Sequence, residues 1–440
     1  MTSVTRTDRP SIAAFFGLGM IGTMPGVRDA LLMLAERGFR VDLFVRGDPS
    51  YPPPDFGDAP ISVVSDKPGI FDRGPTTHPR WMRGPSPKPY LWAVRRLYHP
   101  LWRRLAFRRE LRRAHRASPY HCLIALDSQA LVDCARYGRV LGVPVVFWSL
   151  ELMFRSELRT RRERRFKERE ARLSREAALV IVQDPWRGGA LVEENSLDPA
   201  NVAFVPNAPR GRARRRRCEH LRRALGIHPD RTIVLYSGAL AHWAASLELV
   251  KAARDWPERF VLVVQSRMSL EGSRWDYFLR VRDAADPSRV CLVNEPVSSG
   301  RFQDVIDSAD IGVALYEPRT PGPEGSLVRN MELMGHSSGK VACYLQSGLP
   351  IVTSGLPGLR ELVADFRCGR CVRSAHEVVD ALEEIMTDYD GFVGRACRAF
   401  DERLELGTHF GPALARIAAL SEGSARPGGV LPEHEVLARR

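Results

Sequence analysis

The sequence has no uncharged apolar run long enough to cross a bilayer. Its longest such stretch, Ile12 to Met24, is shorter than the roughly 20 residues that a membrane-spanning helix needs. Arg6 and Arg9 precede this stretch, as in a signal peptide. However, an amphipathic helix and a strand follow at once, as at the start of a folded domain. We therefore expect a cytoplasmic protein.

Cysteine spacing typical of a disulfide scaffold is also missing. The 8 cysteines are scattered, and several, such as Cys122, Cys134 and Cys291, lie in apolar surroundings, which favours reduced thiols. Cys368 and Cys371 form a C-x-x-C pair, but no second ligand pair follows nearby, so a structural zinc site is not predicted. We expect neither a metal nor a bound cofactor.

Acidic residues are outnumbered by basic ones. The sequence has 52 Asp and Glu against 65 Lys and Arg, a formal net charge of +13. This balance allows nucleic acid, an anionic membrane face or a phosphate-rich substrate as a partner. The length of 440 residues and the 44% hydrophobic share are enough for two or three globular domains.

The N-terminal segment has a β-α-β pattern. A predicted strand, Ile12 to Phe16, is followed by a glycine loop, Gly17 to Gly22. A helix comes next, with an apolar face that includes Val27 and Leu31, and a second strand covers Val41 to Val45. This order predicts a parallel sheet.

The glycine loop matches G-x-G-x-x-G, which by itself suggests dinucleotide binding. Two details disagree with an NAD enzyme: Thr23 to Gly26 intervene before the helix, and Arg46 stands where an acid is expected. We interpret Gly19 and Gly22 as letting the backbone approach a ligand in a cleft. A plain tight turn is an equal alternative.

The β-α alternation stops once and then begins again, so we predict two doubly wound α/β domains. The interruption is an arginine-rich linker near residues 206 to 217. The predicted divisions are an N-terminal Rossmann-like domain at 1–208, a C-terminal one at 209–390, a C-terminal helix at 391–421 and a disordered tail at 422–440.

The segment that follows Gly335 predicts an anion site. Ser337 and Ser338 are suited to cap a helix over Val341 to Ser347. The amides at a helix N-terminus attract an anion, and Lys340 adds a full positive charge there. A diphosphate pocket is therefore favoured over a solvated lysine.

Several segments resemble glycosyltransferase family 4 and its GT-B relatives. The run SSGKVACYLQSGLPIVTSGLPGLRELV resembles the donor-site signature of that family. Weaker similarity covers most of residues 120 to 400, in four further segments: Val180–Asp184, Val205–Ala208, Val234–Leu240 and Ala309–Ala314.

The resemblance implies two Rossmann-like domains that face each other across a cleft. It implies transfer of a sugar, with retention, from a nucleoside-diphosphate donor on the C-terminal domain. The acceptor would be a polysaccharide, glycolipid or lipid-linked saccharide on the N-terminal domain, on the side of the glycine loop. By the same resemblance, Gly238, Ser338, Gly339 and Lys340 would hold the diphosphate, and Val297 would lie near the base.

Two positions depart from the family pattern. Cys343 stands where many relatives have a ribose-binding glutamate, and Gly335 replaces the partner glutamate. Phosphate-binding cations after Gly238 are also missing, so His242 and Tyr344 are our candidates for rebuilding the donor site. A catalytically degenerate binding protein and a sugar-nucleotide epimerase are the alternatives that these departures leave open.

Two carboxylates are candidates for catalysis or acceptor positioning. Asp127 and Glu151 each follow a predicted strand, on the side of an α/β sheet where ligands bind. A helix cap or a surface carboxylate is an equal alternative for each.

Two basic stretches remain. Arg95 to Arg116 interleaves arginines with Leu, Trp and Phe, which suits a helix lying on an anionic membrane, although an ordinary surface helix has the same pattern. Arg212 to Arg217 is interpreted as linker, because no nucleic-acid recognition fold accompanies it.

Overall fold

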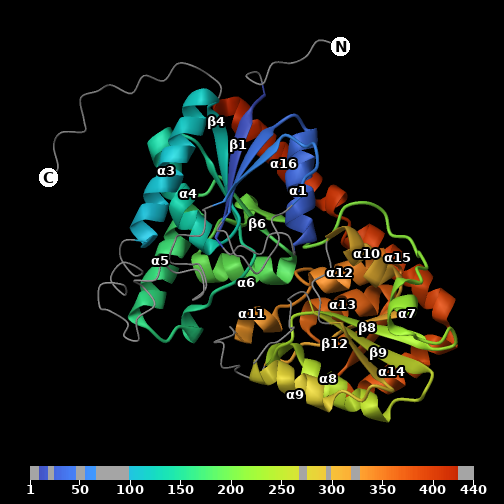
Figure 1. Cartoon of the computed structure of the whole chain (residues 1–440). Coiled ribbons are helices and arrows are strands. Elements are labelled where there is room, and N and C mark those ends of the chain that lie inside the picture. Colours follow the sequence, from blue (N-terminus) through green and yellow to red (C-terminus); the bar gives the residue numbers. More distant parts are fainter. Residues whose placement is uncertain are drawn as a thin grey trace, which may run out of the picture.

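The computed structural model describes residues 9–17, 24–45, 55–65, 99–266, 275–293, 299–318 and 328–424. These residues form two lobes, each built around a parallel sheet (Figure 1). The first sheet has the strand order β3-β2-β1-β4-β5-β6-β7, and the second has the order β10-β9-β8-β11-β12-β13. Both follow the doubly wound pattern, in which the chain reverses its direction of travel across the sheet after the third strand. The predicted fold class is confirmed.

The N-terminal sheet alternates with helices along the chain. Its strands are β1 (Ser11–Phe16), β2 (Arg40–Val45), β3 (Ile61–Ser65), β4 (Tyr120–Ala125), β5 (Val145–Trp148), β6 (Leu179–Val182) and β7 (Val202–Phe204). Its helices are α1 (Pro25–Glu36), α3 (His99–Ala117), α4 (Ser128–Leu141), α5 (Arg161–Arg175) and α6 (Pro185–Asn195). Helix α5 begins at Arg161, where Thr160 and Glu163 form a capping box.

Both faces of this sheet are buried. In β1, Ile12, Ala14 and Phe16 face one core, and Ala13 and Phe15 face the other. Helix α1 covers the first face, and α3, α4, α5 and α6 contribute to the second. Apolar residues on both sides of a strand explain why β1 is continuously hydrophobic rather than alternating with polar residues.

The C-terminal domain repeats this architecture. Its strands are β8 (Thr232–Gly238), β9 (Phe260–Ser266), β10 (Val290–Val293), β11 (Ile311–Ala314), β12 (Ile351–Ser354) and β13 (Gly369–Val372). The helices α8 (Ser246–Ala252), α9 (Asp276–Ala284) and α14 (Val378–Thr387) cover one face. The opposite face is covered by α7 (His220–Leu225), α10 (Ser299–Asp307), α12 (Gly339–Gln346), α13 (Pro357–Phe366) and α15 (Tyr389–Arg403).

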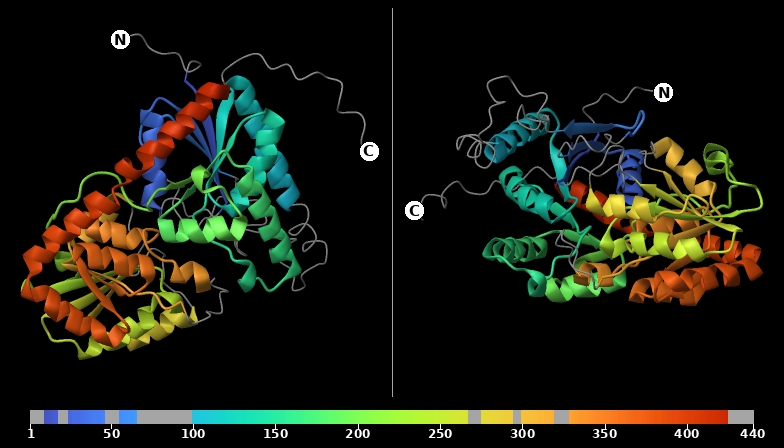
Figure 2. Two further views of the ribbon diagram at one scale, coloured as in Figure 1. Left: turned by 180° about the vertical axis from the view of Figure 1, so that it is seen from behind. Right: turned by 60° about the horizontal axis from the view of Figure 1, so that its bottom comes forward.

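The last described helix returns to the first domain. The region predicted as one C-terminal helix holds most of α15 and of α16 (Leu406–Ser424), and α16 lies along the N-terminal lobe (Figure 2). Phe410 is fully buried there and stacks on Trp148, with ring centroids 5.6 Å apart. The main chain therefore passes between the domains twice.

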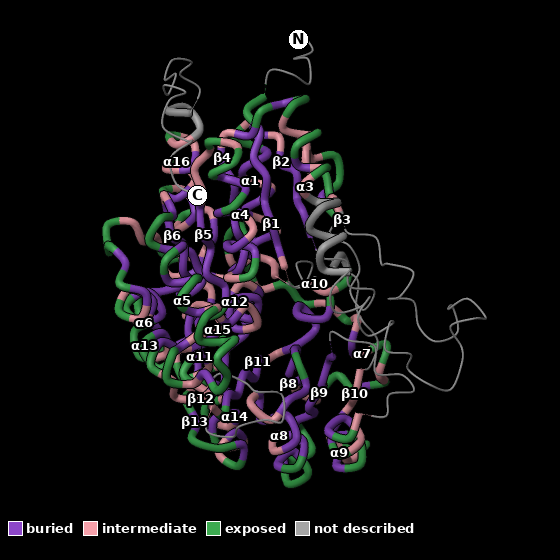
Figure 3. Tube along the Cα trace, turned by 90° about the vertical axis from the view of Figure 1, so that its left-hand side faces the viewer, coloured by how far each residue is buried: buried purple, intermediate pink, exposed green. Residues whose placement is uncertain are grey.

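The central strands of both lobes, such as β1, β8 and β9, are buried along most of their length, whereas β3 and β7 have exposed residues (Figure 3). In the part of the chain that the structure describes, no helix is both long and apolar enough to span a membrane.

The contact between α16 and the N-terminal sheet can be tested by removing one ring. We expect Phe410→Ala to lower the free energy of unfolding of the N-terminal domain by about 3–5 kcal/mol, because a fully buried phenylalanine leaves a cavity. Denaturant unfolding followed by tryptophan fluorescence measures this, since Trp148 contacts the lost ring. Val140→Ala is the control, because Val140 is 55% exposed and should change stability by less than about 0.5 kcal/mol. Equal midpoints for the two variants would contradict the assigned packing.

Candidate donor site and domain junction

In the C-terminal sheet, β8 and β11 are neighbours, and the chain reverses its direction of travel across the sheet between them. The candidate donor residues lie at this switch point. Gly238 ends β8, and Tyr316 follows β11. The Nζ of Lys340 lies 4.5 Å from the ring centroid of Tyr236 and 5.0 Å from that of Tyr316. In doubly wound sheets, ligands bind beyond the carboxyl ends of the strands at such a switch point.

Gly238 allows this close approach. A Cβ at position 238 would lie 3.2 Å from Lys340 Nζ, so a side chain there would crowd the ammonium group. The ammonium group itself is buried, and the two tyrosine rings provide cation–π contacts for it.

The N-terminus of α12 is capped by one serine rather than two. Ser338 Oγ accepts from the Val341 amide at 3.4 Å and lies 2.5 Å from the Tyr316 hydroxyl. Ser337 Oγ instead donates to the sulfur of Met334. Ser338 therefore joins the helix start to the residue that follows β11, and so fixes the end of α12 against the switch point.

Gly339 lies against the segment that joins the two domains. A Cβ added to it would lie 3.1 Å from the side-chain nitrogen of Asn207, which belongs to the segment between the domains. Asn207 donates its amide to the His336 carbonyl at 2.9 Å and its side-chain nitrogen to the Ser337 carbonyl at 3.3 Å. The chain between the domains is thus bound directly to the loop that carries the candidate diphosphate residues.

The other two donor candidates lie around the same strand. Tyr344 is fully buried, and its hydroxyl accepts from the Ser237 amide at 2.8 Å, so it supports β8 just before Gly238. His242 begins a short 3-10 helix, and its ring meets that of Tyr277 edge-on at 4.3 Å. Next to it, Trp243 stacks on Tyr316 with centroids 6.3 Å apart.

On the N-terminal domain, Asp127 lies where β4 ends. One carboxylate oxygen accepts from the Gly17 amide at 2.7 Å and the other accepts from the Ala130 amide at 2.6 Å, which caps α4. Burial raises the pKa of Asp127, while these amide hydrogen bonds oppose that shift. Asp127 therefore fixes the start of the glycine loop.

Glu151 lies at the junction of the domains with its side chain 58% exposed. Its Oε2 accepts from the side-chain nitrogen of Asn330, which lies in α11 (Val328–Glu332) of the C-terminal domain, at 2.5 Å. The Asn330 side-chain oxygen accepts from the Leu152 amide and from Arg187, each at 2.9 Å. One asparagine thus binds the loop after β5 from across the junction.

The buried side chain of Arg187 binds both the loop after β5 and Asn330. It is 1% exposed, and its guanidinium also donates to the Leu150 carbonyl at 3.0 Å. Burial lowers the pKa of Arg187, against the opposing charges of Glu151 and Asp184. Neither Arg187 nor Asn330 has a sequence signal, because neither belongs to a motif and their contacts span 143 residues.

Three predicted positions, Gly19, Gly22 and Val297, lie outside the described residues, as does the tail from 425 onwards. Within the described ranges, no group of three or more His, Cys, Asp and Glu side chains is arranged to hold a metal ion. Tyr236, Tyr316 and Asn207 are site residues that our sequence analysis did not single out. The position of Tyr316 just after the segment Ala309–Ala314, which resembles the GT-B relatives, was the available signal.

Neither a protein-family model nor a curated protein sequence matches the chain. Solved structures do. A sucrose-phosphate synthase from Thermosynechococcus elongatus aligns with a TM-score of 0.64 and 16% identity, over 94% of this chain and 99% of that one. HepE of Anabaena, in complex with UDP and glucose, aligns with a TM-score of 0.59 and 14% identity, over 94% and 98%. A glycosyltransferase from Rickettsia africae aligns with a TM-score of 0.60 and 9% identity, over 94% and 99%.

These likenesses extend over both domains, so they compare the whole two-domain arrangement rather than one Rossmann-like half. At such identities they establish the fold. The chain has the two-domain GT-B fold of glycosyltransferases.

His336 at the domain junction should make the stability of the protein depend on pH. Its backbone amide donates to Asp184 at 3.1 Å, and its backbone carbonyl accepts from the Asn207 amide. Burial lowers the pKa of its imidazole from 6.5 to about 4. Between these pH values the unfolded chain binds a proton that the native protein does not. Stability therefore falls as the pH is lowered from 6.5 to 4, by at most about 3 kcal/mol from this group.

Urea unfolding at several pH values between 7.5 and 4.5 measures this contribution. We expect His336→Gln to lose less stability on acidification than the wild type, and His376→Gln, at an exposed position, to follow the wild type. Parallel pH profiles for all three proteins would exclude His336 as a source of the acid sensitivity.

Proposed function

We propose that the protein transfers a sugar from a nucleoside-diphosphate donor to an acceptor. The observation that carries this proposal is the position of Lys340: its ammonium lies beside Gly238, at the start of α12 and at the switch point of the C-terminal sheet. Such a site offers a cation and helix amides to a diphosphate.

The chemistry that this site supports is stabilisation of a leaving group. When the bond from the sugar to the diphosphate breaks, negative charge grows on the phosphate oxygens. Preorganised amides and a buried ammonium stabilise that charge without having to reorganise. We assign this role to Lys340 and to the backbone at Gly238, Ser338 and Gly339, with Ser337, His242, Tyr344 and Val297 retained as donor-side candidates.

A uridine donor is the first choice to test. HepE, which shares the fold, has been solved with UDP and with UDP-glucose. Cys343 stands where the family pattern has a ribose-binding glutamate, and it is buried in α12. We therefore expect ribose recognition in this protein to differ from that pattern, and a panel of nucleotides is needed rather than UDP alone.

On the acceptor side, we assign Glu151 the role of positioning the acceptor or accepting its proton. Its carboxylate is exposed at the domain junction, as contact with an acceptor requires. We assign Asp127, whose two oxygens are bound by amides, to shaping the loop that contains Gly19 and Gly22. A saccharide or lipid-linked acceptor, retention, and membrane contact through Arg95–Arg116 remain parts of the proposal.

Donor binding is tested by calorimetric titration of the full chain with UDP, GDP and their sugar derivatives. We expect binding of at least one, and we expect Lys340→Ala to weaken it by about tenfold to a hundredfold, because a charge-assisted contact with phosphate is lost. Lys251→Ala removes an exposed lysine from α8 and should bind as the wild type does. If Lys340→Ala binds as tightly as Lys251→Ala, the diphosphate site lies elsewhere.

Turnover separates positioning of the acceptor from donor binding. We expect Glu151→Gln to lower kcat by about 10²- to 10⁴-fold while the Kd for the donor stays unchanged, since the carboxylate acts on the acceptor. Glu168→Gln, on the exposed surface of α5, is the control. Chromatography of the released nucleotide measures the rate, and the anomeric configuration of the product reports retention. A variant with full activity would remove Glu151 from the mechanism.

One alternative is favoured by a particular residue. With Cys343 in place of the glutamate, a binding protein without transferase activity would retain the Lys340-dependent affinity and release no nucleotide. An epimerase, the other alternative, would convert the nucleotide sugar with no acceptor present.

A further inference from the structure

A second basic site lies on the linker between the domains, away from the donor residues. The chain there forms one wall of a cavity of about 540 Å³. The wall carries Arg210, Arg212, Arg214 and Arg216, and Gln303 of α10 and Gln346 of α12 also line the cavity. Figure 1 shows the linker passing beside α10 and α15 before it enters α7.

The linker backbone is held in place by Asp401 of α15, by Glu405 in the turn between α15 and α16, and by Gln346 at the end of α12. The Gly211 amide donates to Glu405 at 2.9 Å, and the Ala213 amide donates to Asp401 at 2.7 Å. The Arg214 amide donates to the Gln346 carbonyl at 2.8 Å. Three successive anchors fix the positions of the arginine Cα atoms, so the basic wall is preformed.

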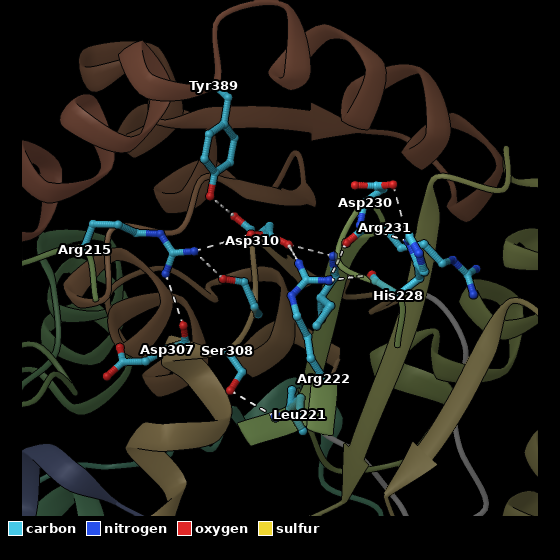
Figure 4. Close-up of polar contacts among 12 residues, drawn as sticks. Arg215, Leu221, Arg222, His228, Asp230, Arg231, Asp307, Ser308, Asp310 and Tyr389 are labelled. Carbon is cyan, nitrogen blue, oxygen red and sulfur yellow. Dashed lines mark hydrogen bonds and ion pairs between the residues drawn. The ribbon is translucent and has the colours of Figure 1, made fainter. Parts of the chain in front are cut away.

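The side chains alternate between inside and outside, as in an extended strand. Ala213 packs against the core, and Arg215 turns inward, where its guanidinium donates to the Ala309 carbonyl at 2.8 Å. Arg215 and Arg222 also reach Asp310 from two sides (Figure 4). Because the intervening residues point inward, Arg212, Arg214 and Arg216 are exposed and line the cavity.

The outward arginines carry charge that the described carboxylates do not neutralise. Arg210 pairs with Glu36, but Arg212, Arg214 and Arg216 form no ion pair with a carboxylate in the described ranges. Asp307 also lines the cavity and opposes an anion, although its Oδ1 already accepts from Gln303 at 3.0 Å. Three guanidinium groups on alternate residues therefore outweigh one hydrogen-bonded carboxylate.

We propose that this cavity binds a small anion that carries several phosphate groups. Guanidinium groups match phosphate oxygens in a two-pronged geometry, and a polyphosphate brings enough charge for three of them in one small volume. The cavity volume is within the range of small-ligand sites. A nucleic acid would need a longer basic groove or stacking aromatic residues, and none of the described residues that line this cavity is aromatic.

The two anion sites lie at opposite ends of one helix. Gly339 and Lys340 begin α12 on the donor side, and Gln346 ends it at the linker cavity. The ligand of the linker cavity is therefore an effector rather than the sugar donor. Because it would contact the segment that joins the domains, its binding would add to the hydrogen bonds that already hold that segment in place.

Calorimetric titration of the full chain with inorganic tripolyphosphate tests the proposal. We compare Arg212→Gln, Arg214→Gln and Arg216→Gln combined with a control that combines Arg161→Gln, Arg162→Gln and Arg165→Gln. The control residues are exposed in α5, and both triple variants reduce the net charge of +13 by three. Each is also made with Lys340→Ala, which removes binding at the proposed donor site.

We expect the linker variant to bind at least about tenfold more weakly, and the α5 variant to bind within about twofold of the wild type. The Lys340→Ala background should leave this difference intact. Thermal unfolding checks that the linker variant is folded, and the three Arg→Lys replacements, which keep the charge, should restore part of the affinity.

Three results would overturn the proposal. Equal loss of binding in both triple variants would mean general attraction to a basic protein. Loss with Lys340→Ala alone would assign the tripolyphosphate to the donor site. A single-stranded RNA that binds more tightly than tripolyphosphate, and whose binding the linker variant loses, would make the surface a nucleic-acid site. None of these results depends on transferase activity.

Discussion

Parallel strands that are buried on both faces need helices on both sides, and each strand must be entered from the same edge. In both domains this constraint sends most of the described crossovers through a helix and leaves the strand carboxyl ends at one edge. Residues of the candidate site lie at or just after these strand ends. Gly238 ends β8, Tyr316 follows β11, and Asp127 follows β4. The order and direction of the strands alone place these residues near the switch points, whatever chemistry they carry out.

This dependence explains what could be read from the sequence. Buried strands such as Ile12–Phe16 are short hydrophobic runs between turn residues, so their positions and the fold class were predicted correctly. The start of α12 was also predictable, because a serine before Gly339 and Lys340 indicates a cap. In each case the signal is local, and a few adjacent residues are enough to specify the structure.

The domain junction could not be predicted in this way. Asn330 satisfies the Leu152 amide, the Glu151 carboxylate and the Arg187 guanidinium, and each of these contacts crosses more than a hundred residues of chain. No periodicity relates them. The return of α16 to the N-terminal domain could not be predicted either, because Phe410 packs against strands more than 200 residues earlier in the chain. Only the assembled fold determines which sheet receives it.

The junction also sets how the candidate site can work. A buried guanidinium is stabilised only while its acceptors stay in place, and those of Arg187 include the Leu150 carbonyl in one domain and Asn330 in the other. Separating the domains here would leave a buried charge with fewer partners, so this corner resists opening. The two chain crossings, near Gly211 and Glu405, are themselves joined by a hydrogen bond. The domains are therefore held together at two places, by the contacts of Asn330 and Arg187 at the junction and by the paired chain crossings.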